Sequence, residues 1–326
     1  MELIVLNIGL DLGVISPKIF TMMVIMALVT TVITTPLLEW IAPREVLRAE
    51  AAERASSANH AARLLLCVGD AGIGPAMARL AVSCVGGSGR SESHALHLHR
   101  PRERTSSYLA RGGQEQGALA SLLDTAAESG VTLSSNQFDS SDAARDICRV
   151  ANERDYDFVV LGLHRPVLGQ NVFGGTVGAV LAEAPAPVAL LVDHGLGRAF
   201  APHALECRTV LALSGGARDA RALDLAEQIL RDPRVSLTVL CLESAALPAR
   251  ADALLGAYPE RVTLRREPAP ARHGALLDAA SRAALVILGL DPAWGLGLDG
   301  LQSEGGRLVL SSPASLLFVH ERTSAR

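Results

Sequence analysis

Lysine is nearly absent from this chain of 326 residues, because Lys18 is the only one and arginine supplies every other basic side chain apart from histidine. A Walker-type phosphate loop needs a lysine after its glycines, so that mechanism of nucleotide binding is excluded. Aromatic residues make up only 3% of the sequence, so a folded core must rest on Leu, Val and Ala. The formal net charge of −4 gives no electrostatic footprint for nucleic acid, and we expect no such partner.

Paired cysteines and catalytic motifs are also missing. The five cysteines are odd in number and scattered, at Cys67, Cys84, Cys148, Cys207 and Cys241. This distribution favours buried thiols in a reducing compartment over a disulfide framework or a zinc site, and we expect no metal. The chain has no nucleophile elbow, no His-Glu-x-x-His and no CxxC pair. We therefore expect no catalytic residues and no enzyme; slow hydrolysis of a bound nucleotide is the one enzymatic alternative left open.

A long uncharged run lies near the start of the sequence. Residues 19–38 hold no charged side chain, and at about 1.5 Å per residue such a helix spans a bilayer core of roughly 30 Å. A signal peptide fits poorly, because the run is too long and lacks a cationic start, so a buried soluble helix is the remaining alternative. Arg44, Arg48 and Arg54 follow the run and, by the positive-inside rule, place residues after about 42 in the cytoplasm. We therefore expect a cell-membrane protein with one transmembrane helix at about 19–38.

After a juxtamembrane linker at 42–61, apolar strands alternate with helices up to about residue 195. The expected strands lie at 63–68, 95–99, 131–133, 158–161 and 188–192, and the expected helices at 76–85, 108–129, 142–153 and 177–184. We expect residues 86–93 to form a flexible loop. Such alternation predicts an α/β domain at 62–195, a doubly wound parallel sheet with helices on both faces.

The same succession of elements recurs after a Gly/Pro/Ala linker at 196–206. The sequence LVILG at 285–289 repeats FVVLG at 158–162, and SPAS at 312–315 echoes APAP at 184–187 before a final strand. We infer that a whole domain is duplicated, with the second copy at 207–326. The expected fold is therefore two tandem doubly wound parallel-sheet domains after an N-terminal transmembrane helix.

The stretch 157–193 carries the pattern most indicative of a ligand. A buried strand ends at Gly162, and Gly175-Thr176 opens a small-residue helix that leads to the next strand, which together form a βαβ unit. Such a unit directs a helix N-terminus at the carboxyl edge of the sheet, where a phosphate binds well. The order Gly162, two residues, Arg165, nine residues, Gly175-Thr176 resembles the G-x2-G-x9-G-[S/T] signature of the universal stress protein family.

This resemblance implies an adenine-nucleotide alpha hydrolase-like fold and ATP or AMP as the ligand. In that family the glycines and the hydroxyl contact phosphates and ribose, and an aspartate after the first strand contacts the adenosine. The resemblance thus implies a nucleotide site made by Asp70, Gly162, Arg165, Gly175 and Thr176. The alternatives are a simple strand–helix junction and an ordinary loop-end aspartate.

Arg165 departs from the family pattern, because a glycine belongs at its position. A side chain there either holds the loop away from the ligand or brings a guanidinium to the phosphates. Pro166 disfavours the helical region for Arg165 and so favours a rigid, non-standard loop with weak or absent binding.

The second copy lacks the motif. After Gly289 and Leu290 come Asp-Pro-Ala-Trp at 291–294, Gly305-Gly306 has no Ser or Thr after it, and no aspartate ends the expected strand at 209–213. We expect this copy to be structural or dimerising.

Residues 7–40, NIGLDLGVISPKIFTMMVIMALVTTVITTPLLEW, look like the end of the membrane domain of monovalent cation:proton antiporters of the second cation:proton antiporter family. The resemblance implies that residues 1–41 end that domain, with its last helix at 19–38; the family's ion-binding aspartates lie on earlier helices. Two functions follow. The first is the cytoplasmic regulatory tail of an antiporter that senses adenine nucleotide, with the antiporter membrane domain as partner. The second is a free-standing, membrane-anchored tandem universal stress protein that binds ATP or AMP and forms a homodimer.

Overall fold

The chain separates into two compact units, Met1–His60 and Ala61–Arg326. The computed structural model describes residues 16–26, 62–85, 90–99, 117–163, 175–216, 218–242, 247–268, 272–291, 296–297, 300–301 and 308–321.

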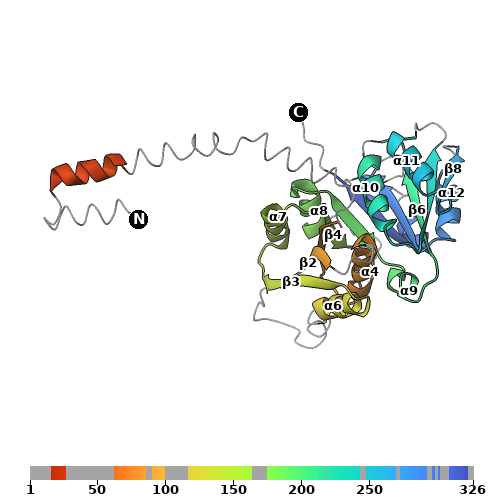
Figure 1. Ribbon diagram of the computed structural model, residues 1–326, viewed down its shortest axis with the longest axis horizontal. Helices are drawn as coiled ribbons and strands as arrows, with labels where there is room; N and C mark the ends of the chain where they lie inside the picture. The colour runs from red at the N-terminus through yellow and green to blue at the C-terminus, as the bar shows by residue number, and fades with distance from the viewer. Residues whose placement is uncertain are drawn as a thin grey trace. The chain divides into compact units, whose positions relative to one another are not determined.

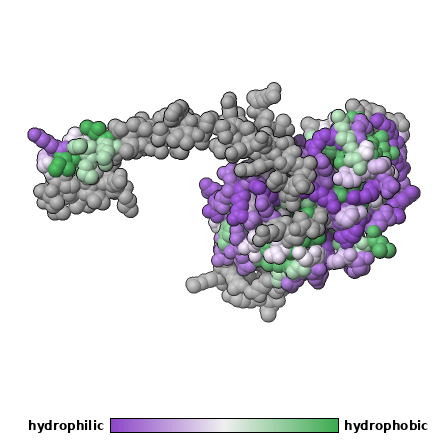
Figure 2. All heavy atoms as spheres, in the orientation of Figure 1, coloured by the Kyte–Doolittle hydropathy of each residue, from purple (hydrophilic) through white to green (hydrophobic). Residues whose placement is uncertain are grey.

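The first unit contains a short apolar helix at residues 17–26. The hydroxyl of Thr21 donates to the Pro17 carbonyl at 2.9 Å, within the first turn. Figure 2 shows apolar side chains over this helix, where Met22 is 75% exposed and Met26 60% exposed. No helix within the described parts of the chain combines the length and the apolar character that crossing a bilayer requires. The rest of the expected transmembrane helix, at 27–38, lies outside the described residues.

The second unit is built on one ten-stranded sheet (Figure 1). Its first half, residues 62–193, contributes five parallel strands in the order β3-β2-β1-β4-β5. These are β1 Leu64–Cys67, β2 Arg90–His99, β3 Thr132–Asp139, β4 Phe158–Gly162 and β5 Val188–Val192. The central strands β1, β4 and β5 are almost wholly buried, as expected for continuous apolar runs covered on both faces.

The second half, residues 207–321, repeats this arrangement in reverse, so that the sheet continues β12-β9-β6-β7-β8. Its strands are β6 Cys207–Leu213, β7 Val235–Leu242, β8 Val262–Glu267, β9 Leu285–Gly289 and β12 Ser315–His320. The halves meet where β12 pairs antiparallel with β5, with Phe318 opposite Leu190. A separate small hairpin joins β10, Leu296–Gly297, to β11, Gly300–Leu301. The predicted duplication of a doubly wound domain is thus confirmed, and its two copies share one sheet.

Helices connect the strands in both halves. In the first half they are α4 Gly74–Val85, α6 Ala118–Glu128, α7 Ala143–Glu153, α8 Gly175–Glu183 and the short α9 Leu196–Ala199. In the second half they are α10 Asp219–Ile229, α11 Ala249–Ala257 and α12 Arg272–Ala280, with one more turn at 308–311. Helix α4 packs against α6, and α7 packs against α8 (Figure 1). Right-handed crossovers place these two pairs on opposite faces of the sheet.

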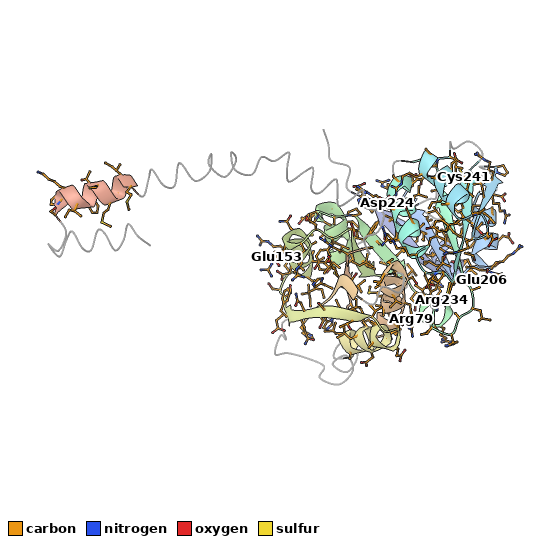
Figure 3. The ribbon with its side chains drawn as sticks, in the orientation of Figure 1. Arg79, Glu153, Glu206, Asp224, Arg234 and Cys241 are labelled. Atoms are coloured by element: carbon orange, nitrogen blue, oxygen red, sulfur yellow. The ribbon has the colours of Figure 1, made fainter. Side chains whose placement is uncertain are left out.

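A polar clamp links the two halves beyond the strand pairing. Asp232 is buried and its carboxylate accepts from the Ser83 hydroxyl of α4 at 3.3 Å. The guanidinium of Arg234 (Figure 3) pairs with Asp232 at 2.7 Å and donates to the Ala201 carbonyl at 2.8 Å. Asp232 and Arg234 together therefore link α4, the segment after α9 and the turn before β7.

Three local expectations are corrected. Strand β2 begins at Arg90, inside the expected loop at 86–93, because the fully buried Ser93 accepts from the Leu64 amide and donates to the Ala62 carbonyl. Strand β3 extends to Asp139, since its mostly exposed side chains at the sheet edge need not be apolar. Helix α9 lies in the expected linker. It begins there because Asp193 Oδ1 accepts the backbone N–H groups that open it.

Candidate functional site

The carboxyl ends of β1 and β4 open side by side at one edge of the sheet, because these strands are parallel neighbours in register. Asp70 follows β1 in the loop to α4, and Gly162 is the last residue of β4. Helix α8 begins with Gly175 and Thr176 and then leads back to β5. Four predicted site residues thus lie at one edge, and Arg165 lies outside the described residues.

Asp70 shapes the loop that carries it. Its side chain is half-buried, and Oδ1 accepts a hydrogen bond of 2.9 Å from the Gly72 amide nitrogen. Aspartates often make this bond to a backbone N–H two residues ahead, and it fixes a turn. A carboxylate accepts several hydrogen bonds at once, so Asp70 can hold its loop and also accept from a hydroxyl of a ligand.

Gly162 is in close contact with the start of α4. A Cβ added at Gly162 would lie 2.7 Å from Cδ1 of Ile73 and 3.2 Å from Cε of Met77. A side chain at this position would displace Ile73 and Met77, because both pack directly on the backbone of β4. Ile73 was not among the predicted site residues, and an apolar residue next to a helix start gives no sequence signal of such a role.

Gly175 and Thr176 form the first turn of α8. Gly175 has φ of 62°, in the left-handed region that glycine adopts without steric cost. The prediction began this helix at residue 177, whereas it begins two residues earlier, so both residues belong to the helix itself. The N–H groups of a first turn have no intrahelical acceptors, and the helix dipole favours an anion there.

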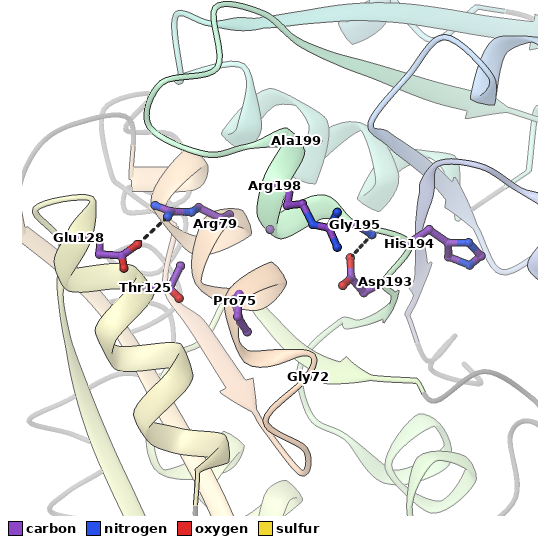
Figure 4. Close-up of a pocket in the computed structure, with 11 residues that line it drawn as sticks. Gly72, Pro75, Arg79, Thr125, Glu128, Asp193, His194, Gly195, Arg198 and Ala199 are labelled. Carbon is purple, nitrogen blue, oxygen red and sulfur yellow. Dashed lines mark hydrogen bonds and ion pairs between the residues drawn. The ribbon is translucent and has the colours of Figure 1, made fainter. Parts of the chain in front are cut away.

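A groove of about 980 Å³ borders the loop after β1 (Figure 4). It is lined by Gly72, Pro75, Arg79, Thr125, Glu128, Asp193, His194, Gly195, Gly197, Arg198 and Ala199. Arg79 is only 6% exposed and pairs with Glu128 at 3.0 Å, between α4 and α6. Asp193 and Glu128 offset Arg79 and Arg198, so neither sign of charge dominates the groove. The sequence did not predict this groove, because it does not distinguish a buried arginine in an alanine-rich helix, such as Arg79, from an exposed one.

The strand registers identify the corresponding loop of the second half. Strands β4 and β9 pair with β1 and β6 in equivalent registers, so Leu64 corresponds to Thr209. Counting on along both loops, Asp70 corresponds to Gly215. The second half therefore has no carboxylate where the first half has Asp70.

Acidic side chains surround this second loop instead. Asp219, which corresponds to Gly74, is buried and accepts from the Gly215 amide at 2.6 Å. Burial raises the pKa of the Asp219 carboxyl, and the charge of Asp291 raises it further. A Cβ added at Gly216 would lie 2.3 Å from Oδ2 of Asp291. A phosphate would meet negative charge here, and one of the amides it needs is already bonded.

All five cysteines lie in the described residues, and none forms a disulfide. Cys84, Cys207 and Cys241 are buried, while Cys67 and Cys148 are half-buried. Burial raises the pKa of the Cys84 thiol to about 12, so this side chain stays protonated at neutral pH.

Comparison with known proteins finds similarity to two kinds of protein. The model of the universal stress protein family matches residues 60–191. These residues form a universal stress protein domain. The alignment with a crystal structure of a universal stress protein from Archaeoglobus fulgidus DSM 4304 covers 81% of this chain and 98% of that protein, at 12% identity and a TM-score of 0.48.

The chain is also similar to cation/proton antiporters. Cation/H(+) antiporter 17 of Arabidopsis thaliana is 28% identical over 279 residues, which cover 74% of this chain and 34% of the relative. The Na(+)/H(+) antiporter NhaS4 of Synechocystis sp. is 69% identical over 42 residues, or 13% of this chain and 10% of the relative. The chain thus spans about a third of the length of the plant relative. Both resemblances inferred from the sequence, to universal stress proteins and to antiporters of the second cation:proton antiporter family, are confirmed.

Proposed function

We propose that this chain acts as the regulatory tail of a monovalent cation:proton antiporter and catalyses no reaction of its own. The observation that carries this is the similarity to a plant antiporter over 279 residues, which extends well beyond the universal stress protein domain. A universal stress protein unit in a transport protein has no ion path of its own. Its contribution is therefore to respond to a signal and change the rate of exchange.

The signal that fits the site is an adenine nucleotide, ATP or AMP. Asp70 accepts hydrogen bonds from the adenosine, and Gly162 ends the neighbouring strand β4 at the same edge. The first turn of α8 offers the Gly175 and Thr176 amides, with the Thr176 hydroxyl, to the phosphates. Arg165 replaces a glycine of the family pattern and so weakens the site. The shared edge of β1 and β4 and the positive φ of Gly175 support this assignment.

The membrane is the expected location. The antiporter similarity and the uncharged run at 19–38 support a transmembrane helix there, with residues after about 42 in the cytoplasm. The partner is then the antiporter membrane domain. Because β12 already pairs with β5 inside the chain, a homodimer would have to form through a different surface.

A free-standing, membrane-anchored stress protein that binds ATP or AMP is the second candidate. The family match at 60–191 favours it, since that match covers the whole set of candidate nucleotide residues. In this case nucleotide binding would be the function itself and would not control exchange.

The genomic reading frame before Met1 and a transport assay separate the two. We expect the frame to continue upstream into further membrane helices, as in the antiporter relatives. In membrane vesicles, the full reading frame should exchange cations for protons, and deleting residues 62–326 should change the rate without abolishing it. A stop codon directly upstream, or exchange that is identical without these residues, would contradict the proposal.

A further inference from the structure

His320 is a buried histidine at the joint between the two halves. It ends β12 and lies opposite Val188, the first residue of β5, in the antiparallel pairing that joins the halves. Only 4% of the residue is exposed. It therefore belongs to the second half by sequence and contacts the first half in space.

The imidazole of His320 has its hydrogen-bond partner on one side of the ring. The backbone of Leu181 in α8 accepts from the ring, which by itself raises the pKa of His320. Its Nδ1 atom is buried and has no partner among the residues that the structure describes. The donor is thus Nε2, which is the arrangement of a neutral imidazole.

Two charged groups face His320 and act in opposite directions: the Arg218 charge lowers the pKa of His320 and the Glu321 charge raises it. Arg218 approaches from the start of α10, and Glu321 follows His320 in the chain. The Glu321 carboxylate is engaged at both oxygens by Arg221, at 2.8 and 2.9 Å. From α8 the backbone of Leu181 faces the ring, and from β5 the strand partner of His320 is the apolar Val188. A proton on Nδ1 would have no acceptor among the described residues and would add a second positive charge beside Arg218.

We propose that His320 makes the joint between the halves sensitive to pH, so that acidification loosens β12 from β5 and α8. Burial and the Arg218 charge lower the pKa of His320 in the folded chain. The ordinary value of about 6.5 applies when the joint is open. The joint is therefore fully stable above the open-state pKa of about 6.5, and it loses stability as the pH falls from there through the lower pKa of the folded chain.

The loosening would extend to α8, because Leu181 lies on the helix that begins with Gly175 and Thr176. The proposal does not require a ligand. It describes a response of the folded chain to protons, whether or not the site at the other end of α8 binds nucleotide.

Hydrogen exchange of the full chain tests the proposal directly. Between pH 7.5 and pH 5.5, after correction for the intrinsic rates, the opening constant of peptides covering α8 and β12 should rise by about threefold or more. His320→Gln keeps a side-chain N–H donor for Leu181 and cannot titrate, so its opening constant should stay flat. His203→Gln, at an exposed position, is the matched control and should behave like the native chain.

Two further measurements make the result decisive. Arg218→Gln removes the neighbouring cation, so the rise in opening on acidification should become smaller. Titration of the native chain labelled at histidine should find a His320 pKa below the ordinary range, which also decides the matter if His320→Gln does not fold. An unchanged pH response in a folded His320→Gln chain, or a His320 pKa at or above its ordinary value, would overturn the proposal.

Discussion

In the first half, the loop after β1 carries Asp70 beside Gly162, and α8 opens with a left-handed Gly175. In the second half, the corresponding loop carries Gly215, and its amide is already bonded to the carboxylate of Asp219 at 2.6 Å. The helical residues 308–311 precede β12, as α8 precedes β5. The two loops differ although the strands that present them are repeated.

This difference shows which parts of a duplicated domain the fold requires. Strands β4 and β9 are both fully apolar up to their final glycine, because both are covered on two faces in the same sheet. The loops at the carboxyl edges lie outside this strand pairing. They can therefore differ between the halves while the strands stay the same.

The largest effect is expected at the joint that both halves share. Phe318 is fully buried in β12, opposite Leu190 of β5. Phe318→Ala should lower the free energy of unfolding by about 3–5 kcal/mol, through lost apolar contact and the cavity left behind. Denaturant unfolding should show both halves destabilised together.

Leu310→Ala is the control for this prediction. Leu310 is 56% exposed, so its truncation should change the unfolding free energy by less than about 0.5 kcal/mol. If Phe318→Ala destabilised the second half and left a separate transition of the first half unchanged, the halves would not form one core.

A second prediction compares helix contacts in the two halves. A Cβ at Gly74 would lie 2.3 Å from Oγ of Ser121 and 3.0 Å from the backbone nitrogen of Leu122, so α4 and α6 leave no room for it. Gly74→Ala should cost about 1–3 kcal/mol of unfolding free energy, measured by denaturant titration.

The same change at Gly256 should have the opposite sign. Nothing lies within 4 Å of a Cβ added there, and Gly256 is within helix α11. Gly256→Ala should stabilise the chain by about 0.4–1 kcal/mol, because alanine has fewer conformations to lose on folding. If Gly74→Ala and Gly256→Ala lowered the unfolding free energy equally, the close contact of α4 with α6 at Gly74 would not explain the loss.

Arg165→Gly should change ligand affinity and not the stability of the fold. Restoring the glycine of the family pattern should let the loop approach the phosphates and tighten ATP binding by about tenfold, or roughly 1.4 kcal/mol. Calorimetry with the full chain measures this. Tight native binding that weakens in the variant would instead identify Arg165 as a phosphate ligand.

The alternation of strands and helices was predictable, because strands buried on both faces are continuous apolar runs such as FVVLG and VALLV. The start of β2 and the length of β3 were not, since Ser93 is buried through hydrogen bonds and β3 is a polar edge strand. The pairing of β12 with β5 could not be predicted either, because the apolar sequences of two strands do not show which strands of the two halves pair with each other. Site residues could be proposed from glycine spacing. Their covering partner Ile73 and the acceptor role of Asp219 depend on packing.

We expect only the first half of the chain to bind nucleotide. ATP titration of four full-length proteins tests this expectation most directly. These are the native chain and Arg165→Gly, with Asp70→Asn and Asp219→Asn each made in the Arg165→Gly chain. We predict one site per chain, an affinity at least about tenfold lower with Asp70→Asn, and no change with Asp219→Asn. Loss of binding with Asp219→Asn while Asp70→Asn has no effect, or no saturable binding even after Arg165→Gly, would contradict it.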